Sequence, residues 1–176
     1  STLFAVSQDE LKPALTGVLF KFSENSFTAV STDGHRLVKH ERKDFLTEKT
    51  KEEIIIPKKF LSFLSTQLSD KNIDLVIGES FITAQLQKDI IITKIIDEKF
   101  PDYNSVIPKD NNKTFLIDKK VLLGAIRRVA IFSNKSTHQV ALSLNKDKSF
   151  VTTEDPEKSS KAKEHIVGEF SGEEII

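Results

Sequence analysis

The polar residues that could bind a ligand are concentrated at one strand junction, in the run Ser31-Thr32-Asp33-Gly34-His35-Arg36-Leu37. Hydroxyl, carboxylate, imidazole and guanidinium groups stand here side by side, next to an apolar leucine. The residues on both sides alternate as strands do, so Asp33-Gly34 is typical of a tight hairpin turn. A turn needs only the Asp-Gly pair, and the additional polar groups make this junction the first candidate binding site.

Catalysis finds little support elsewhere in the sequence. No glycine-rich phosphate loop, GxSxG string or HExxH string is present, and the acidic residues lie mostly in solvated runs. There is no Cys, and the four histidines are scattered, with only His35 and His40 close together. We therefore expect no catalytic residue, no metal site and no cofactor.

Composition indicates a globular protein of one domain or one and a half. The 176 residues are 38% hydrophobic and include 13 Phe, which is enough to build a core. Lys+Arg and Asp+Glu both total 26, a balance that can still conceal separate basic and acidic faces. Without a long apolar run, a signal-peptide pattern or cysteine, we expect a cytoplasmic protein.

An internal repeat predicts the organisation of the chain. A short apolar run, a helix-opening residue and a Lys pair occur at 55–61 and again at 116–122. Pro57 and Asp118 are both suitable helix openers, so each copy predicts a strand followed by a helix. The apolar residues of the two helices recur at helical spacing: Phe60, Leu61, Leu64 and Leu68, then Leu122, Ala125, Ile126 and Val129.

Three strand-like runs follow each helix, so the unit is β-α-β-β-β and the predicted fold class is α+β. The runs are 73–77, 81–86 and 90–96 in the first copy, and 140–144, 150–153 and 162–170 in the second. Residues 1–53 fit the end of a third unit, with the end of a helix at 3–6 and strands near 15–22, 26–32 and 36–42. Two such units that share a sheet make a natural domain, because one helix and four strands cannot bury both faces alone. A polar run at 109–112 then predicts domains 1–110 and 111–176.

Basic residues recur at the same place in both helices. Lys58, Lys59 and Ser62 lie away from the apolar stripe of the first helix, and Lys120, Arg127 and Arg128 share an outward face of the second. Such residues are also typical of a solvated helix face. Their repetition favours a basic stripe that meets phosphates without reading sequence.

Other prominent apolar residues have structural interpretations when considered alone. Leu15, on the predicted strand before Gly17, suits a core, and so does the Ile131-Phe132 pair after the second helix. Phe100-Pro101-Asp102-Tyr103 is typical of a proline-rigidified turn with two aromatic anchors.

Taken together and in order, four strings resemble the family of bacterial sliding clamps, the beta subunits of DNA polymerase III. They are Ser-Thr-Asp-Gly-His-Arg-Leu at 31–37, Ile-Pro-Lys-Lys at 56–59, Phe-Pro-Asp-Tyr at 100–103 and Arg-Arg-Val-Ala-Ile-Phe-Ser-Asn at 127–134. The resemblance covers essentially the whole chain. It implies the middle domain of a clamp without its first strand and most of its first helix, followed by the first half of the third domain.

The resemblance also implies a function. Clamps of this family are non-catalytic subunits of the polymerase III holoenzyme that form homodimeric rings, with sheets outside and basic helices lining a pore around double-stranded DNA. Such a ring is a processivity factor that slides on DNA independently of sequence. Its protein partners are the polymerase III catalytic subunit, the clamp loader and other proteins with a clamp-binding motif, among them mismatch-repair proteins and ligase.

Motif by motif, the resemblance assigns residues to three roles. The pocket that takes partner peptides would contain Leu15, Thr32, Gly34, His35, Arg36, Leu37, Pro101 and Val106. The DNA-facing residues would be Lys58, Lys59, Lys120, Arg127 and Arg128. Ile131 and Phe132 would lie at the dimer interface.

Two other classes of function remain open at this stage. One is a free-standing peptide-binding or scaffold domain with no role on DNA. The other is an enzyme whose site has no recognised motif.

Overall fold

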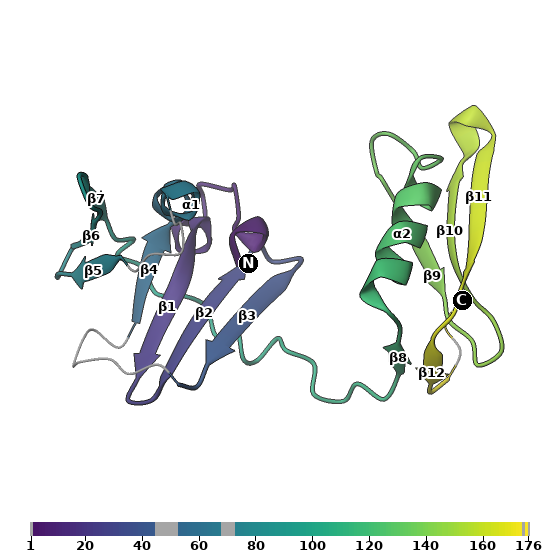
Figure 1. The fold of residues 1–176 in the computed structure, drawn as a ribbon, viewed down its shortest axis with the longest axis horizontal. Helices are drawn as coiled ribbons and strands as arrows, with labels where there is room; N and C mark the ends of the chain where they lie inside the picture. The colour runs from purple at the N-terminus through teal and green to yellow at the C-terminus, as the bar shows by residue number, and fades with distance from the viewer. Residues whose placement is uncertain (1, 45–52, 68–72, 174, 176) are drawn as a thin grey trace. The chain divides into compact units, whose positions relative to one another are not determined.

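The chain forms two compact units, Ser1–Ile107 and Pro108–Ile176. The computed structural model describes residues 2–44, 53–67, 73–173 and 175. Each unit contains one of the predicted helices among its described residues, α1 (Lys58–Gln67) in the first and α2 (Lys119–Ala130) in the second (Figure 1).

The main sheet of the first unit is antiparallel and has the order β3-β2-β1-β4. Its strands are β1 (Gly17–Ser23), β2 (Ser26–Thr32), β3 (Leu37–Arg42) and β4 (Glu53–Pro57). The first three belong to one predicted repeat, whereas β4 opens the next repeat and pairs with β1, with Leu19 opposite Ile55. This pairing of β4 with β1 confirms the prediction that two repeats share a sheet.

A second antiparallel sheet has the order β5-β6-β7 and follows α1 in the chain. Its strands are β5 (Asp74–Ile77), β6 (Phe81–Gln85) and β7 (Ile90–Lys94), all within the predicted runs. Phe60 and Leu64 of α1 pack against Ile54 and Ile56 of β4 and against Ile82 of β6. One core therefore joins α1 to both sheets.

The main sheet is covered on both faces. Side chains alternate across a strand, so Ile54 and Ile56 face α1 while Ile55 faces the other way. On that other face Ile55 packs with Leu19, Val30, Leu15 and Phe100. The 3-10 helix η1 (Thr2–Ala5) contacts β2 and β3 on the same face as α1, near the start of the chain in Figure 1.

The second unit builds one three-stranded and one two-stranded antiparallel sheet. The strands β9 (Ala141–Ser143), β10 (Ser149–Asp155) and β11 (Ser160–Ile166) have the order β11-β10-β9. The 3-10 helix η3 (Pro156–Lys158) connects β10 to β11. The strands β8 (Thr114–Leu116) and β12 (Glu169–Ser171) pair with each other.

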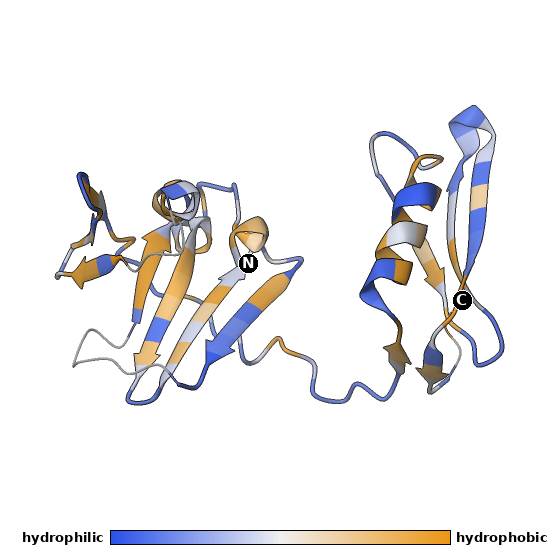
Figure 2. Cartoon of the chain, in the orientation of Figure 1, coloured by the Kyte–Doolittle hydropathy of each residue, from blue (hydrophilic) through white to orange (hydrophobic). Residues whose placement is uncertain are grey.

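The helix α2 is capped by Asp118 at its start and packs through one apolar face. The Asp118 carboxylate accepts hydrogen bonds from the backbone N–H groups of Lys120 and Val121, which have no partner within the helix. Ala125 and Val129, four residues apart, are buried against Val151 and Ile166. In Figure 2 the helix accordingly alternates between hydrophilic and hydrophobic bands.

Three sequence-based predictions of element bounds were wrong. Leu15 lies in the 3-10 helix η2 (Pro13–Thr16) and not on a strand, because Pro13 fixes the first turn and the strand begins only at Gly17. Pro57 closes β4 instead of lying in the first helical turn. The predicted end of a helix at 3–6 is the 3-10 helix η1. Leu68 lies outside the described residues.

The predicted strand 162–170 is two strands, β11 and β12, separated at Val167-Gly168. A side chain at Gly168 would come within 2.7 Å of the Leu116 carbonyl oxygen and the Phe115 ring. The glycine thus permits the close approach at which the chain leaves one sheet and enters the other.

Candidate functional site

The predicted hairpin at the polar junction forms, with a four-residue loop in place of a two-residue turn. Thr32 pairs with Leu37, so Asp33 to Arg36 make the connection. The Thr32 hydroxyl donates to the Arg36 carbonyl over 2.8 Å and accepts from the Gly34 N–H over 3.1 Å. Gly34 has a φ of +92°, a conformation that side-chain-bearing residues rarely adopt. The loop is therefore held by its own side chains.

Asp33 organises the other half of this loop. Its Oδ1 accepts from the backbone N–H groups of His35 and Arg36, both over 3.0 Å, and its Oδ2 accepts from Arg36 Nε over 2.9 Å. These hydrogen bonds, led by the one from the Arg36 backbone, lower the pKa of Asp33 from 3.8 to about 2. The carboxylate is therefore ionised at every physiological pH.

The structure brings several predicted pocket residues together. Leu15 is 8% exposed and belongs to the same apolar cluster as Phe100, with Leu37 and Tyr103 packed against it. The loop residues Gly34, His35 and Arg36 are exposed beside this cluster, and Thr32 is half-buried. Residues 15, 32–37 and 100–103, which are far apart in sequence, thus form one surface of the first unit.

Pro101 and Val106 belong to the same segment, and both are exposed. The rings of Phe100 and Tyr103 pack edge to face at 6.4 Å, so the exposed Pro101 stands between two anchored residues. Val106 is 67% exposed in the turn that follows. Both side chains are exposed and could contact an apolar partner, as the resemblance implies for the peptide pocket.

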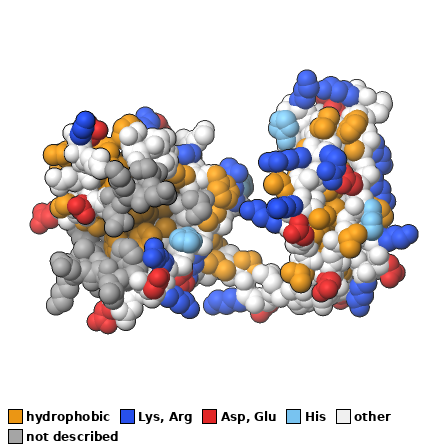
Figure 3. All heavy atoms as spheres, in the orientation of Figure 1, with side chains coloured by type: hydrophobic (Ala, Val, Ile, Leu, Met, Phe, Trp, Pro, Cys, Tyr) orange, Lys and Arg blue, Asp and Glu red, His pale blue; other side chains and the backbone are white. Residues whose placement is uncertain are grey.

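The basic helix faces form in both units. Lys59 is exposed on α1 and Lys58 is half-buried, whereas Lys120, Arg127 and Arg128 are all exposed on α2. Neither helix has an acidic residue in its first turn, although Lys pairs lie there in both. Figure 3 shows Lys and Arg side chains over α2, with hydrophobic ones between them.

Arg128 differs from the other basic residues because it is already paired. Its Nε and Nη2 donate to the two oxygens of Glu164 on β11, over 3.0 and 2.6 Å. The hydrogen bond from Arg128 lowers the pKa of Glu164, and the one to Glu164 raises the pKa of Arg128. This bidentate pair offsets the charge that Arg128 would offer to a phosphate.

The apolar pair after α2 is exposed, so its interpretation as core was wrong. Ile131 is 77% exposed and Phe132 48%. The backbone beneath them is fixed, because Ser160 Oγ donates to the Phe132 carbonyl over 3.0 Å and Asn134 Nδ2 donates to the buried Asp155 over 3.2 Å. An exposed apolar pair on a fixed backbone suits a contact with another chain.

Comparison with known proteins identifies the family. Residues 1–102 match the model of the DNA polymerase III beta subunit, central domain, and residues 104–176 match that of the C-terminal domain. The chain belongs to the DNA polymerase III beta subunit family. Its fold is accordingly the α+β DNA clamp fold.

Relatives within the beta subunit family agree over the same length. The beta sliding clamp of Pseudomonas putida is 31% identical over 176 residues. A crystal structure of the Bacillus subtilis sliding clamp superposes with a TM-score of 0.90 at 31% identity, covering 99% of this chain and 47% of that one. The Pseudomonas aeruginosa beta subunit gives 0.89 at 28% identity, covering 99% and 48%. The chain thus spans about half the length of the curated relatives it matches.

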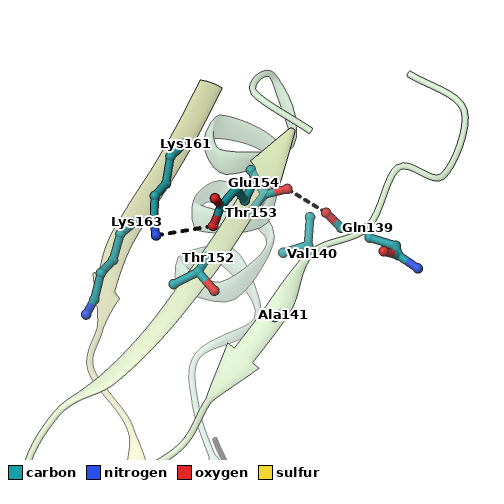
Figure 4. A pocket seen from close by; sticks show the side chains of 8 residues that line it. All are labelled: Gln139, Val140, Ala141, Thr152, Thr153, Glu154, Lys161 and Lys163. Atoms are coloured by element: carbon teal, nitrogen blue, oxygen red, sulfur yellow. Dashed lines mark hydrogen bonds and ion pairs between the residues drawn. The ribbon is translucent and has the colours of Figure 1, made fainter. Parts of the chain in front are cut away.

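An open depression of about 690 Å³ lies on the β9-β10-β11 sheet, in a place that sequence analysis did not single out (Figure 4). Thr152, Glu154, Lys161 and Lys163 line it from the face opposite α2. Lys161 is paired with Glu154 over 3.2 Å, and Lys163 Nζ lies 3.9 Å from the Phe150 ring centre. Both lysines in the depression therefore already have partners.

Among the described residues, no group of three or more His, Asp or Glu side chains is placed to hold a metal ion. None of the helices in the described part of the chain is long and apolar enough to cross a membrane.

Proposed function

We propose that this chain is part of a ring-shaped DNA polymerase processivity factor, a non-catalytic clamp that encircles duplex DNA and tethers the replicative polymerase. The observation that carries the proposal is the match of the chain, end to end, to two consecutive domains of the clamp family. On this proposal residues 1–110 are most of a middle domain and 111–176 the first half of a third. The protein would act in the cytoplasm.

The basic helices would line the pore. In both α1 and α2 a Lys pair occupies the first turn, where the helix macrodipole disfavours cations by about 0.3–1 kcal/mol each at low ionic strength. A locally unfavourable feature repeated at equivalent positions indicates function more than stability. Weak, sequence-blind phosphate contacts allow a ring to slide.

The hairpin surface, formed by residues 15, 32–37 and 100–103, would bind short peptides. These peptides would belong to the polymerase catalytic subunit, the clamp loader and other clamp-binding proteins. Leu15 and Leu37 provide an apolar contact, and the ordered loop between Thr32 and Leu37 provides hydrogen-bonding groups beside it. A P. aeruginosa sliding clamp has been crystallised bound to griselimycin. That compound is a convenient probe for a small-molecule site in this chain.

Retention on circular DNA tests the clamp proposal. The experiment uses a complete clamp. This term means the dimer of a protomer in which this chain is joined to the further segments that its relatives have. A clamp loaded on nicked circular DNA should stay bound and should be lost once the circle is linearised. Equal loss from both substrates would instead favour a peptide-binding domain with no role on DNA.

A pair of neighbouring arginines refines the test of the pore face. Arg127→Gln should weaken loading. It should also reduce the slope of log K against log salt concentration by the equivalent of about one phosphate contact. Arg128→Gln should have a smaller effect, because Glu164 already neutralises that side chain. Equal effects of the two substitutions would mean that the pair with Glu164 opens on DNA.

A further inference from the structure

We propose that Asp33 and Phe4 are positioning residues that fix the Arg36 guanidinium, so that its two outer amino groups face an oxygen acceptor of the bound partner peptide. The inference rests on the proposed peptide-binding function of the hairpin. It concerns two residues to which the motif comparison assigned no role.

The first support is the way Asp33 divides its two oxygens. Oδ1 accepts from the backbone N–H groups of His35 and Arg36, which shapes the loop. Oδ2 accepts from Arg36 Nε over 2.9 Å, which orients a side chain. The carboxylate of Asp33 is only 18% exposed, whereas the Arg36 side chain is 61% exposed. The partly buried Asp33 carboxylate thus holds the exposed Arg36 guanidinium by its Nε edge.

The second support is an exposed aromatic ring in the right place. The Arg36 guanidinium carbon lies 5.9 Å from the centre of the Phe4 ring, within the range of a cation–π contact. Phe4 is 61% exposed, and η1, which carries it, is tied to β2 by a 2.6 Å hydrogen bond from Ser31 Oγ to the Thr2 carbonyl. Ser31 is fully buried, so η1 and its ring are held against the hairpin.

These two contacts leave only part of the Arg36 guanidinium free to bind. Nε is used by Asp33, and within the described residues no hydrogen bond is made by either Nη group. The two remaining amino groups form a planar fork that suits a peptide carbonyl or a carboxylate. Because the side chain is already oriented, binding does not incur the full cost of ordering a long flexible side chain.

Asp33→Asn separates the two tasks of the carboxylate. The amide oxygen can replace Oδ1 and keep both backbone hydrogen bonds, while the amide NH2 takes the place of Oδ2 and cannot accept from Nε. In the complete clamp this variant should bind a labelled peptide from the polymerase III catalytic subunit about two- to tenfold more weakly. Phe4→Leu should weaken binding in the same direction. Asp147→Asn, in the exposed β9–β10 hairpin of the other unit, is the matched control.

A double-mutant cycle with Arg36→Ala distinguishes positioning from a general structural role. If Asp33 acts through Arg36, Asp33→Asn should have no effect on peptide affinity in the Arg36→Ala background. In the 176-residue chain, NMR should show the Arg36 Nε–H protected from exchange in the wild type and unprotected in Asp33→Asn. A cost that persists without Arg36, or unchanged affinity in the single variant, would overturn the inference. Failure of the wild-type clamp to bind the peptide at all would instead overturn the proposed function.

Discussion

At the scale of single residues, the side chains of the Ser31–Leu37 run make contacts on both faces of the main sheet and in the loop at its end. Ser31 bonds to η1 on one face, and Leu37 joins the apolar cluster on the other. Thr32 and Asp33 use their side chains to build the loop between them. Only Gly34, His35 and Arg36 are left exposed at the tip. The loop of this run is therefore ordered by its own side chains before any partner binds.

The sequence identified this surface but not its internal organisation. The density of polar groups around Asp33-Gly34 was the signal that made this junction a candidate site. The contacts of Ser31 and Phe4 with the hairpin exist only because η1 folds back onto β2 and β3. Local sequence patterns do not predict this packing. Asp33 could have been noticed, because Asp at the start of a turn commonly accepts from the backbone two residues later.

The low pKa of Asp33 predicts a specific acid response. Because the pKa in the folded chain, about 2, lies below the ordinary 3.8, Asp33 contributes stability that is fully present above about pH 4. This contribution is lost as the pH falls through about 2. An NMR titration of the carboxyl carbons should show Asp33 with a midpoint near 2, and a midpoint near 4 would contradict the loop geometry.

At the scale of elements, the buried faces of the helices and most strand connections were predictable, but the break between β11 and β12 was not. The spacing of Phe60 with Leu64 and of Ala125 with Val129 located both buried faces. The break between β11 and β12 was missed because residues 162–170 form one continuous strand-like run in sequence. It becomes apparent only when Gly168 meets Phe115 and Leu116 of a strand some fifty residues earlier.

The cap of α2 can be tested directly. Asp118→Ala should destabilise the helix start by about 1 kcal/mol, since two backbone N–H groups lose their acceptor. Asp118→Asn should cost less, because asparagine is itself a good cap. Hydrogen exchange of the Lys120 and Val121 amides reports the effect residue by residue. Equal exchange in the wild type and the alanine variant would show that tertiary packing, and not the cap, holds this turn.

The exposed apolar pair after α2 makes a prediction about assembly. In the complete clamp, changing both Ile131 and Phe132 to Ser should convert the dimer into a folded monomer, because a few apolar anchors carry most of an interface's energy. Sedimentation velocity at micromolar concentration measures the change. The matched control is Val121→Ser with Leu123→Ser, since both of these side chains are also exposed on α2. A dimer that survives the first pair, or dissociates equally with the second, refutes the assignment.

At the scale of the molecule, the first unit separates its two candidate surfaces by a sheet. The helix α1, with Lys58 and Lys59 at its start, packs on the face that carries Ile54 and Ile56. Leu15, Leu37 and Phe100 pack on the face that carries Ile55. This arrangement follows from one strand, β4, whose alternate residues are buried in opposite directions. The basic helix and the apolar cluster of the candidate peptide surface therefore pack on opposite faces of one sheet.

This separation predicts that DNA and peptide binding are energetically independent. In the complete clamp, Lys59→Glu should weaken DNA loading without changing peptide affinity, and His35→Ala should do the reverse. Sites separated by a sheet and its side chains usually give additive effects within about 0.3–0.5 kcal/mol. Peptide affinity, measured by fluorescence polarisation with and without circular DNA, should accordingly change by less than about twofold. A larger change would mean that the ring transmits DNA occupancy through β4 to the hairpin, a coupling that the buried contacts of this strand would then have to carry.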